Sequence, residues 1–231
     1  MARSLGERLD ALPIARLLWR HAARVIPAAF GTIAAYEDAV DPADLELLLA
    51  LEAPDEAARL ALIPSADRIV GAGAGYVMPS FTHPPPDGSR FVPPRAFGAY
   101  YAARDAATAV AETVYHRERT FRETHVPAGD FDQRLLVARI RATNARDLRG
   151  HGSLFADVLD PGSYGAGQAA GVALRDAAVD AVAYDSVRRP GGACMVVFRP
   201  RCVSGCRARG LLTYRWDGSR VTDVFGLQRV G

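Results

Sequence analysis

A strand that leads directly into a helix, between Gly98 and His116, is the feature that most constrains the fold of this chain. Tyr100 and Tyr101 favour a strand, and Asp105 has the position of an N-cap for the helix that follows. Small or apolar residues then recur at helical spacing, at Ala106, Ala109, Val110, Thr113 and Val114. The pattern predicts a helix packed against a sheet.

Further strands are expected downstream. Alternation at 135–141 indicates one strand, and residues 180–185 and 194–198 have the composition of two short buried strands. A helix of small residues is expected from about Gly165 to Ala178. We predict its inward face at Ala169, Val172 and Ala173. The chain as a whole is therefore expected to be α+β.

The first eighty residues are expected to be rich in helix and loop. The leucines from Leu9 to Leu18 give a loosely helical face, and Asp41-Pro42 has the form of a helix start. Glycines 71, 73 and 75 lead into a proline-rich segment, which argues against a phosphate-binding loop. An Asp-Gly pair at 217–218 indicates a tight hairpin. We expect a single domain over residues 1–231, with a helix- and loop-rich part at 1–80, a core at 81–205 and a C-terminal hairpin at 206–231.

Composition excludes several classes of function. The formal net charge is only +2, which argues against direct nucleic-acid binding, and all 28 basic residues are arginine. No apolar run is long enough to span a membrane or to resemble a signal peptide, so a cytoplasmic protein is expected. Cys194, Cys202 and Cys206 have no second pair of ligands near them, so we expect reduced thiols and no metal site.

A few polar residues stand out against these apolar elements. Glu112 and His116 lie four residues apart, so they share one face of the predicted helix. Arg90 follows a proline-rich loop, where a guanidinium group can reach a cleft. Ser186 follows a buried strand and precedes Arg188. Because no Gly-x-Ser-x-Gly turn surrounds Ser186, we interpret this serine as a hydrogen-bonding residue and not as a nucleophile.

The two tyrosines, Tyr100 and Tyr101, must point to opposite faces of their strand, one of them into the core. Each of these polar residues also has an ordinary structural interpretation, as a surface or packing side chain. Their order along the chain makes them informative together.

In combination, four segments resemble the RES family, which is named for an arginine, a glutamate and a serine. The matching segments are Gly88-Ser89-Arg90-Phe91, Gly98 to Ala103, Thr108 to Glu112 and Val182 to Arg188. The resemblance covers roughly residues 80–205 and reaches back to Leu18-Trp19-Arg20, which is similar to an early strand of the family. Two departures are visible: a long segment between Arg20 and Arg90, and Cys194 at a position where the family often has asparagine.

The resemblance implies an ADP-ribosyltransferase-like fold, a mixed or antiparallel sheet with flanking helices and a helical N-terminal elaboration. It also implies NAD as the substrate, cleavage of the nicotinamide–ribose bond without a metal, and a role as the toxin of a toxin–antitoxin pair. The expected partner is an Xre-type helix-turn-helix antitoxin. The acceptor of the ADP-ribose, which could be water, phosphate or a protein, stays open.

The resemblance implies that Arg90, Glu112 and Ser186 correspond to the arginine, glutamate and serine for which the family is named, and that they are catalytic residues. Tyr101, or Tyr100 in its place, corresponds to the tyrosine on the nicotinamide side. NAD-binding roles are also expected for Arg20, an alternative to Arg90 for the pyrophosphate, and for His116 and Arg188.

Three alternatives to NAD cleavage remain. The chain could be a protein ADP-ribosyltransferase, or a non-catalytic nucleotide-binding module with the same fold. It could also be an unrelated hydrolase that uses Cys194 or Ser186 with His116.

Overall fold

One mixed sheet organises the chain. The computed structural model describes residues 3–28 and 54–227, and within them the strand order is β1-β2-β5-β4-β3-β6-β7. The strands are β1 (Ala15–Pro27), β2 (Tyr100–Ala103), β3 (Gly129–Asp147), β4 (Ala181–Asp185), β5 (Ala193–Val197), β6 (Val203–Trp216) and β7 (Val221–Leu227). Strands β3 and β4 run parallel, and the other pairs are antiparallel. The α+β class predicted from the sequence is confirmed.

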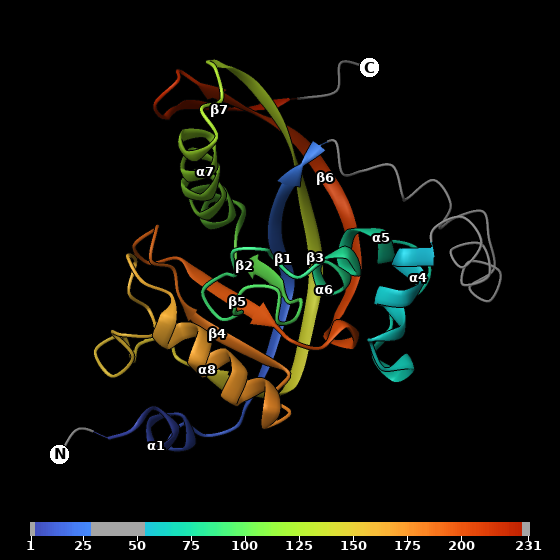
Figure 1. Cartoon of the computed structure of the whole chain (residues 1–231), viewed down its shortest axis with the longest axis vertical. Helices are drawn as coiled ribbons and strands as arrows, with labels where there is room; N and C mark the ends of the chain where they lie inside the picture. The colour runs from blue at the N-terminus through green and yellow to red at the C-terminus, as the bar shows by residue number, and fades with distance from the viewer. Residues whose placement is uncertain (1–2, 29–53, 228–231) are drawn as a thin grey trace.

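The sheet closes on itself at β1. This strand pairs along its length with β3 and also touches β2 through Ala23 and Ala103. Strands β1, β2, β5, β4 and β3 therefore form a ring, and Figure 1 shows β1, β3 and β6, the longest strands of the sheet, running side by side. Several large buried side chains of one core cluster come from the strands of the ring: Trp19, Tyr100, Ile140 and Met195.

Helices cover the sheet on both sides. They are α1 (Leu5–Asp10), α4 (Pro54–Ala61), α5 (Ala74–Val77), α6 (Pro79–Thr82), α7 (Ala106–Glu123) and α8 (Gly165–Asp176), with 3-10 turns at Ser65–Asp67 and Pro200–Cys202. As predicted, Asp105 caps α7, and its carboxylate accepts a hydrogen bond from the Thr108 backbone N–H at 2.8 Å. Among the described residues, no helix has the length and apolar character needed to cross a membrane.

The N-terminal part differs from the expectation. Of residues 3–28, only Leu5–Asp10 form an α-helix, whereas Ala15–Pro27, part of which we expected to continue a helical face, is the long strand β1. Pairing along almost the whole of β3 outweighs the weak helical periodicity of the leucines. The predicted helix start at Asp41-Pro42 lies outside the described residues. The C-terminal hairpin is confirmed, with Gly218 at a φ of +99° in its turn.

The inward face predicted for α8 is wrong. Ala169, Val172 and Ala173 are exposed, and the buried residues are Gly167, Ala170, Gly171 and Leu174. A side chain at Gly167 would collide with the backbone of Arg90, and one at Gly171 with the backbone of Phe91. The helix therefore packs on the segment that carries Arg90 through its glycines, because only glycine allows this close approach.

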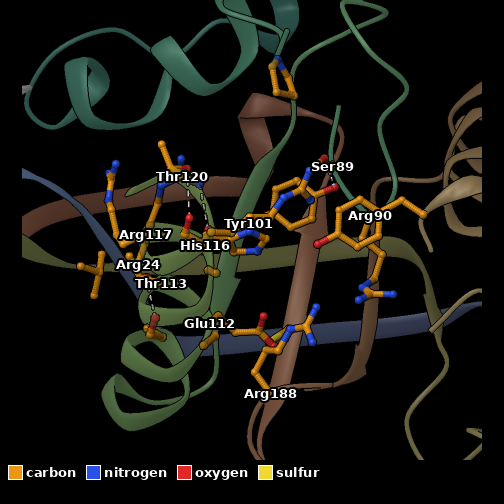
Figure 2. Close-up of a pocket in the computed structure, with 18 of the residues that line it drawn as sticks. Arg24, Ser89, Arg90, Tyr101, Glu112, Thr113, His116, Arg117, Thr120 and Arg188 are labelled. Atoms are coloured by element: carbon orange, nitrogen blue, oxygen red, sulfur yellow. Dashed lines mark hydrogen bonds between the residues drawn. The ribbon is translucent and has the colours of Figure 1, made fainter. Parts of the chain in front are cut away.

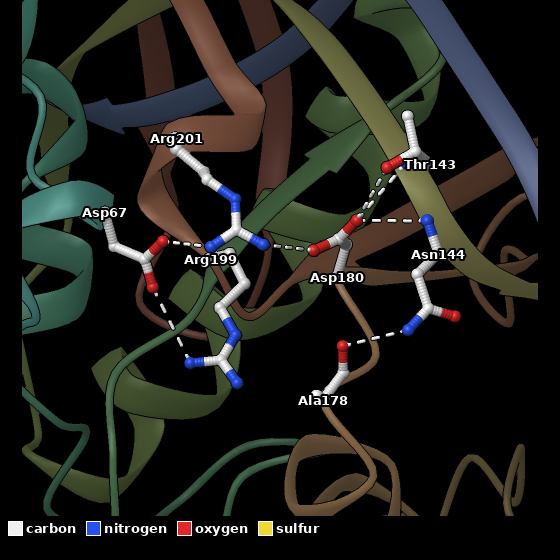
Figure 3. A network of polar contacts seen from close by, with 7 residues as sticks. All are labelled: Asp67, Thr143, Asn144, Ala178, Asp180, Arg199 and Arg201. Atoms are coloured by element: carbon white, nitrogen blue, oxygen red, sulfur yellow. Dashed lines mark hydrogen bonds and ion pairs between the residues drawn. The ribbon is translucent and has the colours of Figure 1, made fainter.

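Two buried aspartates and two arginines form a network at the start of β4 (Figure 3). Asp180 Oδ2 accepts hydrogen bonds from the backbone N–H groups of Thr143, at 3.2 Å, and Asn144, at 3.0 Å. The other oxygen, Oδ1, pairs with Arg201 at 2.9 Å. Arg201 also pairs with buried Asp67, which Arg199 approaches at 3.6 Å. This network joins the end of β3, the beginning of β4 and the turn before β6.

Candidate functional site

A cavity of about 560 Å³ opens between α7, the β1–β2 edge of the ring and the turn that carries Arg90. Its lining includes the predicted site residues Arg90, Tyr101, Glu112, His116 and Arg188. Figure 2 shows Arg24 and Arg117 on one side of this cavity and Arg90 on the other, with Glu112, His116 and Tyr101 between them. The fold thus brings together residues from four separate parts of the chain.

Glu112 lies on α7 and is held by residues of β5 and of the segment after β4. Its Oε1 accepts a hydrogen bond from the Ser186 hydroxyl at 2.6 Å and contacts the Cys194 thiol at 3.5 Å. The other oxygen, Oε2, accepts no hydrogen bond from the part of the chain that the structure describes. The carboxylate is therefore anchored through one oxygen and presents the other to the cavity.

The direction of the Ser186 proton follows from the surrounding backbone. Ser186 Oγ accepts hydrogen bonds from the N–H groups of Arg188, at 3.2 Å, and Arg189, at 3.0 Å. A hydroxyl oxygen has two lone pairs and one proton, so with both lone pairs engaged the proton must point to Glu112. Such an oxygen cannot attack a substrate without breaking this turn, which agrees with the hydrogen-bonding role expected from the sequence.

Cys194 is the second donor to Glu112. It lies on β5, opposite Ala103 and Tyr184, and is buried. Burial raises the pKa of its thiol well above the usual value, and the nearby Glu112 charge raises the pKa further. The thiol is therefore neutral and can donate a hydrogen bond, the chemistry that an asparagine amide would also provide here. The sequence indicated this position only as a departure from the family pattern.

Arg90 is almost completely buried, with 6% of its surface exposed. Its Nη1 donates to the backbone carbonyls of Val158, at 3.3 Å, and Asp160, at 2.8 Å. The guanidinium carbon lies 5.0 Å from the centre of the Tyr164 ring. Because only Nη1 is used in these bonds, the remaining donor edge of the guanidinium can serve a ligand in the cavity.

The two tyrosines separate as predicted, one to each face of β2. Tyr101 reaches the cavity, where its hydroxyl lies 2.7 Å from Ser89 Oγ and accepts a hydrogen bond from the Phe91 N–H at 3.1 Å. Tyr101 therefore fixes the short turn on either side of Arg90. Burial raises the pKa of Tyr101 to about 12, so the phenol stays protonated. Tyr100 is fully buried on the opposite face, with its hydroxyl 3.9 Å from Cys206 Sγ.

Arg20 is not brought to this cavity. It lies exposed on β1, at a register shift between Trp19 and Ala22, and lines a different hollow. Arg24 lines the main cavity instead and donates from Nη1 to the Tyr101 carbonyl at 2.9 Å. A register shift changes the face to which the following residues point. After the shift, Ala23 and Val25 pack on the cavity side of β1, whereas Arg24 shares the face of Ala22 and its guanidinium carbon lies 4.7 Å from the centre of the Tyr100 ring, so alternation alone could not have indicated Arg24.

Positive charge dominates the cavity. Its lining holds five arginines, namely Arg24, Arg90, Arg117, Arg119 and Arg188, and three carboxylates, those of Asp87, Glu112 and Glu123. Burial lowers the pKa of Arg24 and of Arg117, which means that their guanidinium groups are poorly hydrated. Burying a positive charge away from water is unfavourable, and an anionic ligand bound beside these arginines would offset that cost.

His116 is exposed at the cavity, one helical turn after Glu112. Its pKa is lowered, first because neighbouring protein atoms exclude water from the ring and then because Arg188, Arg119 and Arg90 repel a second positive charge. The charge of Glu112 opposes this shift. Among the described residues, no group of three histidine, cysteine or acidic side chains is arranged to hold a metal ion.

Comparisons with known proteins show the fold and the family of this chain. The fold is similar to that of a chain in the crystal structure of the M. tuberculosis MbcT–MbcA toxin–antitoxin complex, with a TM-score of 0.50 and 16% sequence identity over 90% of this chain and 91% of that one. No curated protein is similar enough in sequence to count as a match. The model of the RES domain matches residues 65–217, and the chain therefore belongs to the RES domain family.

Proposed function

We propose that this chain consumes NAD by cleaving the bond between nicotinamide and ribose, as a glycohydrolase or a phosphorylase. The observation that carries the proposal is the Glu112 carboxylate, with Oε1 anchored by Ser186 and Oε2 left without a partner among the described residues, inside a cavity rich in arginine. Membership of the RES family supports NAD as the substrate.

The proposed chemistry needs one well-placed negative charge. As the nicotinamide–ribose bond breaks, positive charge develops on the ribose, and a carboxylate stabilises that charge, as in the cleavage of glycosides. Because Ser186 and Cys194 both donate to Oε1, Glu112 keeps its orientation when the substrate is absent. Nicotinamide leaves as a neutral molecule, so no general acid is needed to protonate it.

The arginines suit the rest of the substrate. Pyrophosphate oxygens are bound well by guanidinium groups, which offer two parallel donors. Arg90 and Arg188 line the cavity near the carboxylate, and Arg24 and Arg117 line its other side. Of the two tyrosines of β2, Tyr101 is the one that lines the cavity, and we assign it to the nicotinamide side.

A hydrolase that uses Ser186 or Cys194 with His116 is disfavoured. The Ser186 hydroxyl donates to Glu112 and not to His116, and both lone pairs of its oxygen accept backbone N–H groups. The raised pKa of the Cys194 thiol removes the thiolate that a cysteine nucleophile requires. A protein ADP-ribosyltransferase and a non-catalytic binding module are the remaining alternatives.

We further propose that the chain acts as the toxin of a toxin–antitoxin pair, silenced by an Xre-type helix-turn-helix protein. The support is family membership, together with a fold that resembles a chain of a toxin–antitoxin complex. An antitoxin that inserts into the cavity would compete with NAD, so NAD and the antitoxin are expected to exclude one another.

Proton NMR of the purified chain with NAD, with and without inorganic phosphate, tests the activity. Free nicotinamide is the expected product, and ADP-ribose-1-phosphate formed only with phosphate would identify a phosphorylase. A parallel incubation of biotin-labelled NAD with cell proteins detects transfer to a protein acceptor. If NAD stays intact in all three incubations, the enzymatic proposal is wrong and the binding-module alternative replaces it.

A further inference from the structure

The exposed face of strands β1, β3 and β6 carries a group of arginines that the cavity does not use. On β1, Arg16, Leu18 and Arg20 alternate with buried Leu17 and Trp19, so the three share the outer face. Leu18 lies directly opposite Arg141 of β3, which places Arg141 on the same face.

The same reasoning extends the face to β6. Arg139 lies two residues before Arg141 and opposite Ser204, and Val137 lies opposite Arg207. We define the arginine face as Arg16, Arg20, His21, Arg139, Arg141 and Arg207. All of its members are exposed.

Among the described residues, the three strands of this face place no carboxylate beside its arginines. Strand β1 contains no Asp or Glu, nor does β6, and those of β3 lie near its two ends, at positions 130, 132 and 147. Within the part of the chain that the structure describes, no guanidinium group of this face forms an ion pair or a hydrogen bond. The net charge of +2 for the whole chain therefore hides a strongly uneven distribution.

The arginines also converge on a hollow of about 260 Å³. Arg20 and His21 from β1, Arg139 from β3 and Arg207 from β6 line it, together with Ser204 and Gly205. Gly205 has a φ of +58°, so the backbone of β6 bends at this point. Three guanidinium groups from three strands around one hollow would bind an oxyanion such as a phosphate group.

The extent of the face favours a polyanion over a single small anion. Arg16 and Arg20 are separated by about 13 Å along β1, and the three strands span about 10 Å in width, at the usual spacings of a sheet. This area matches several successive phosphates of a nucleic acid. Leu18 is the large apolar side chain exposed here, and apart from the imidazole of His21 the face as described carries no aromatic ring on which unpaired bases could stack.

We propose that the arginine face binds the phosphate backbone of duplex DNA without reading its sequence. The low net charge argues against a protein dedicated to nucleic acids, but binding through the backbone depends on the local arrangement of cations. An acidic protein surface is the competing partner. It is disfavoured because a protein interface usually has an apolar core, and this face offers little beyond Leu18.

The test is fluorescence anisotropy of the full chain with a labelled duplex of mixed sequence, over a series of salt concentrations. The test variant is Arg139→Gln/Arg141→Gln/Arg207→Gln, whose sites lie outside the NAD cavity, so the result is independent of the proposed activity. The matched control, Arg3→Gln/Arg95→Gln/Arg220→Gln, removes the same charge from exposed positions elsewhere. Circular dichroism confirms that both variants fold.

We expect the test variant to bind at least about tenfold more weakly at low salt, with a log–log salt dependence shallower by about two to three, since each phosphate contact contributes about 0.9. The control should bind like the wild type within about threefold, because its positions lie off the face. Three results would overturn the proposal: no binding by the wild type at low salt, equal losses in both variants, or tighter binding of polyglutamate or single-stranded DNA than of the duplex.

Discussion

Ser186 and Glu112, 74 positions apart in the sequence, are joined by a hydrogen bond of 2.6 Å from the serine hydroxyl to Oε1. Two backbone N–H groups fix the serine, and the serine in turn fixes the carboxylate. The turn after β4 thus sets the orientation of a side chain on α7. Because the two elements meet only in the folded chain, the site is assembled by the tertiary fold and not by a local motif.

Replacement of Glu112 by glutamine should remove NAD cleavage almost completely while the fold is retained. Glutamine keeps the size of the side chain but loses the charge that stabilises the developing positive ribose, and the loss of one such electrostatic group typically costs a factor of about 10²–10³ in rate. Nicotinamide release measures the activity, and thermal unfolding confirms the fold. Glu118→Gln is the control, since Glu118 lies on the same helix outside the cavity lining. A Glu112→Gln protein with wild-type activity would refute the assigned role.

Ser186→Ala should reduce kcat moderately, by about fivefold, and should leave measurable turnover. Removal of the hydroxyl releases Oε1 from one neutral donor, which is worth about 1 kcal/mol, but the charge of Glu112 remains. A serine nucleophile would behave differently, because its removal abolishes activity. Single-turnover kinetics of the variant separate the two cases, and complete loss of nicotinamide release in a folded Ser186→Ala protein contradicts our interpretation.

The local elements that carry the site could be predicted from the sequence. The way those elements pack against one another could not. Asp105, the tyrosine pair and the strand before Ser186 follow from capping and periodicity, which depend on near neighbours. The place of Arg24 depends on a register shift in β1, and β1 itself forms because β3 is available as a partner. The buried face of α8 likewise depends on the backbone of Arg90 and Phe91. These features require contacts between distant segments, so periodicity alone could not predict them.

Tyr101→Phe should raise KM for NAD severalfold, with a smaller effect on kcat. The phenylalanine cannot bond Ser89 or accept the Phe91 N–H, so the turn that holds Arg90 loosens. Tyr100→Phe is the matched control, because the Tyr100 hydroxyl lies on the opposite face beside Cys206, and its KM should match that of the wild type. Steady-state kinetics of the two variants settle which tyrosine serves the substrate, and a larger effect from Tyr100→Phe would reverse our assignment.

His116 should titrate below its usual pKa of about 6.5 in the free protein. The exclusion of water and three nearby arginines disfavour the imidazolium, so the folded chain releases this proton at a lower pH than the unfolded chain does. The contribution of His116 to stability is therefore complete above about pH 6.5, the pKa in the unfolded chain, and is lost as the pH falls from there through the lower pKa of the folded chain. NMR titration of the imidazole signal, assigned with His116→Gln, measures the pKa. Added ADP-ribose should raise it because phosphate charges favour the imidazolium, and a midpoint at or above 6.5 without ligand would contradict the prediction.

Asp180→Asn should destabilise the fold far more than a comparable change on the surface. Asp180 is buried, accepts hydrogen bonds from two backbone N–H groups and forms an ion pair with Arg201. The asparagine removes the negative charge that faces Arg201 and leaves Asp67 as the remaining buried carboxylate of the described network. Because Arg201 is half exposed, the expected cost comes mainly from the buried carboxylate and its charge-assisted hydrogen bonds, about 2 kcal/mol. Asp130→Asn is the control, because its pair with Arg215 is exposed and should contribute less than about 1 kcal/mol. Urea unfolding of both variants gives the comparison. Equal losses would show that the network in Figure 3 is not what holds β4 to the end of β3.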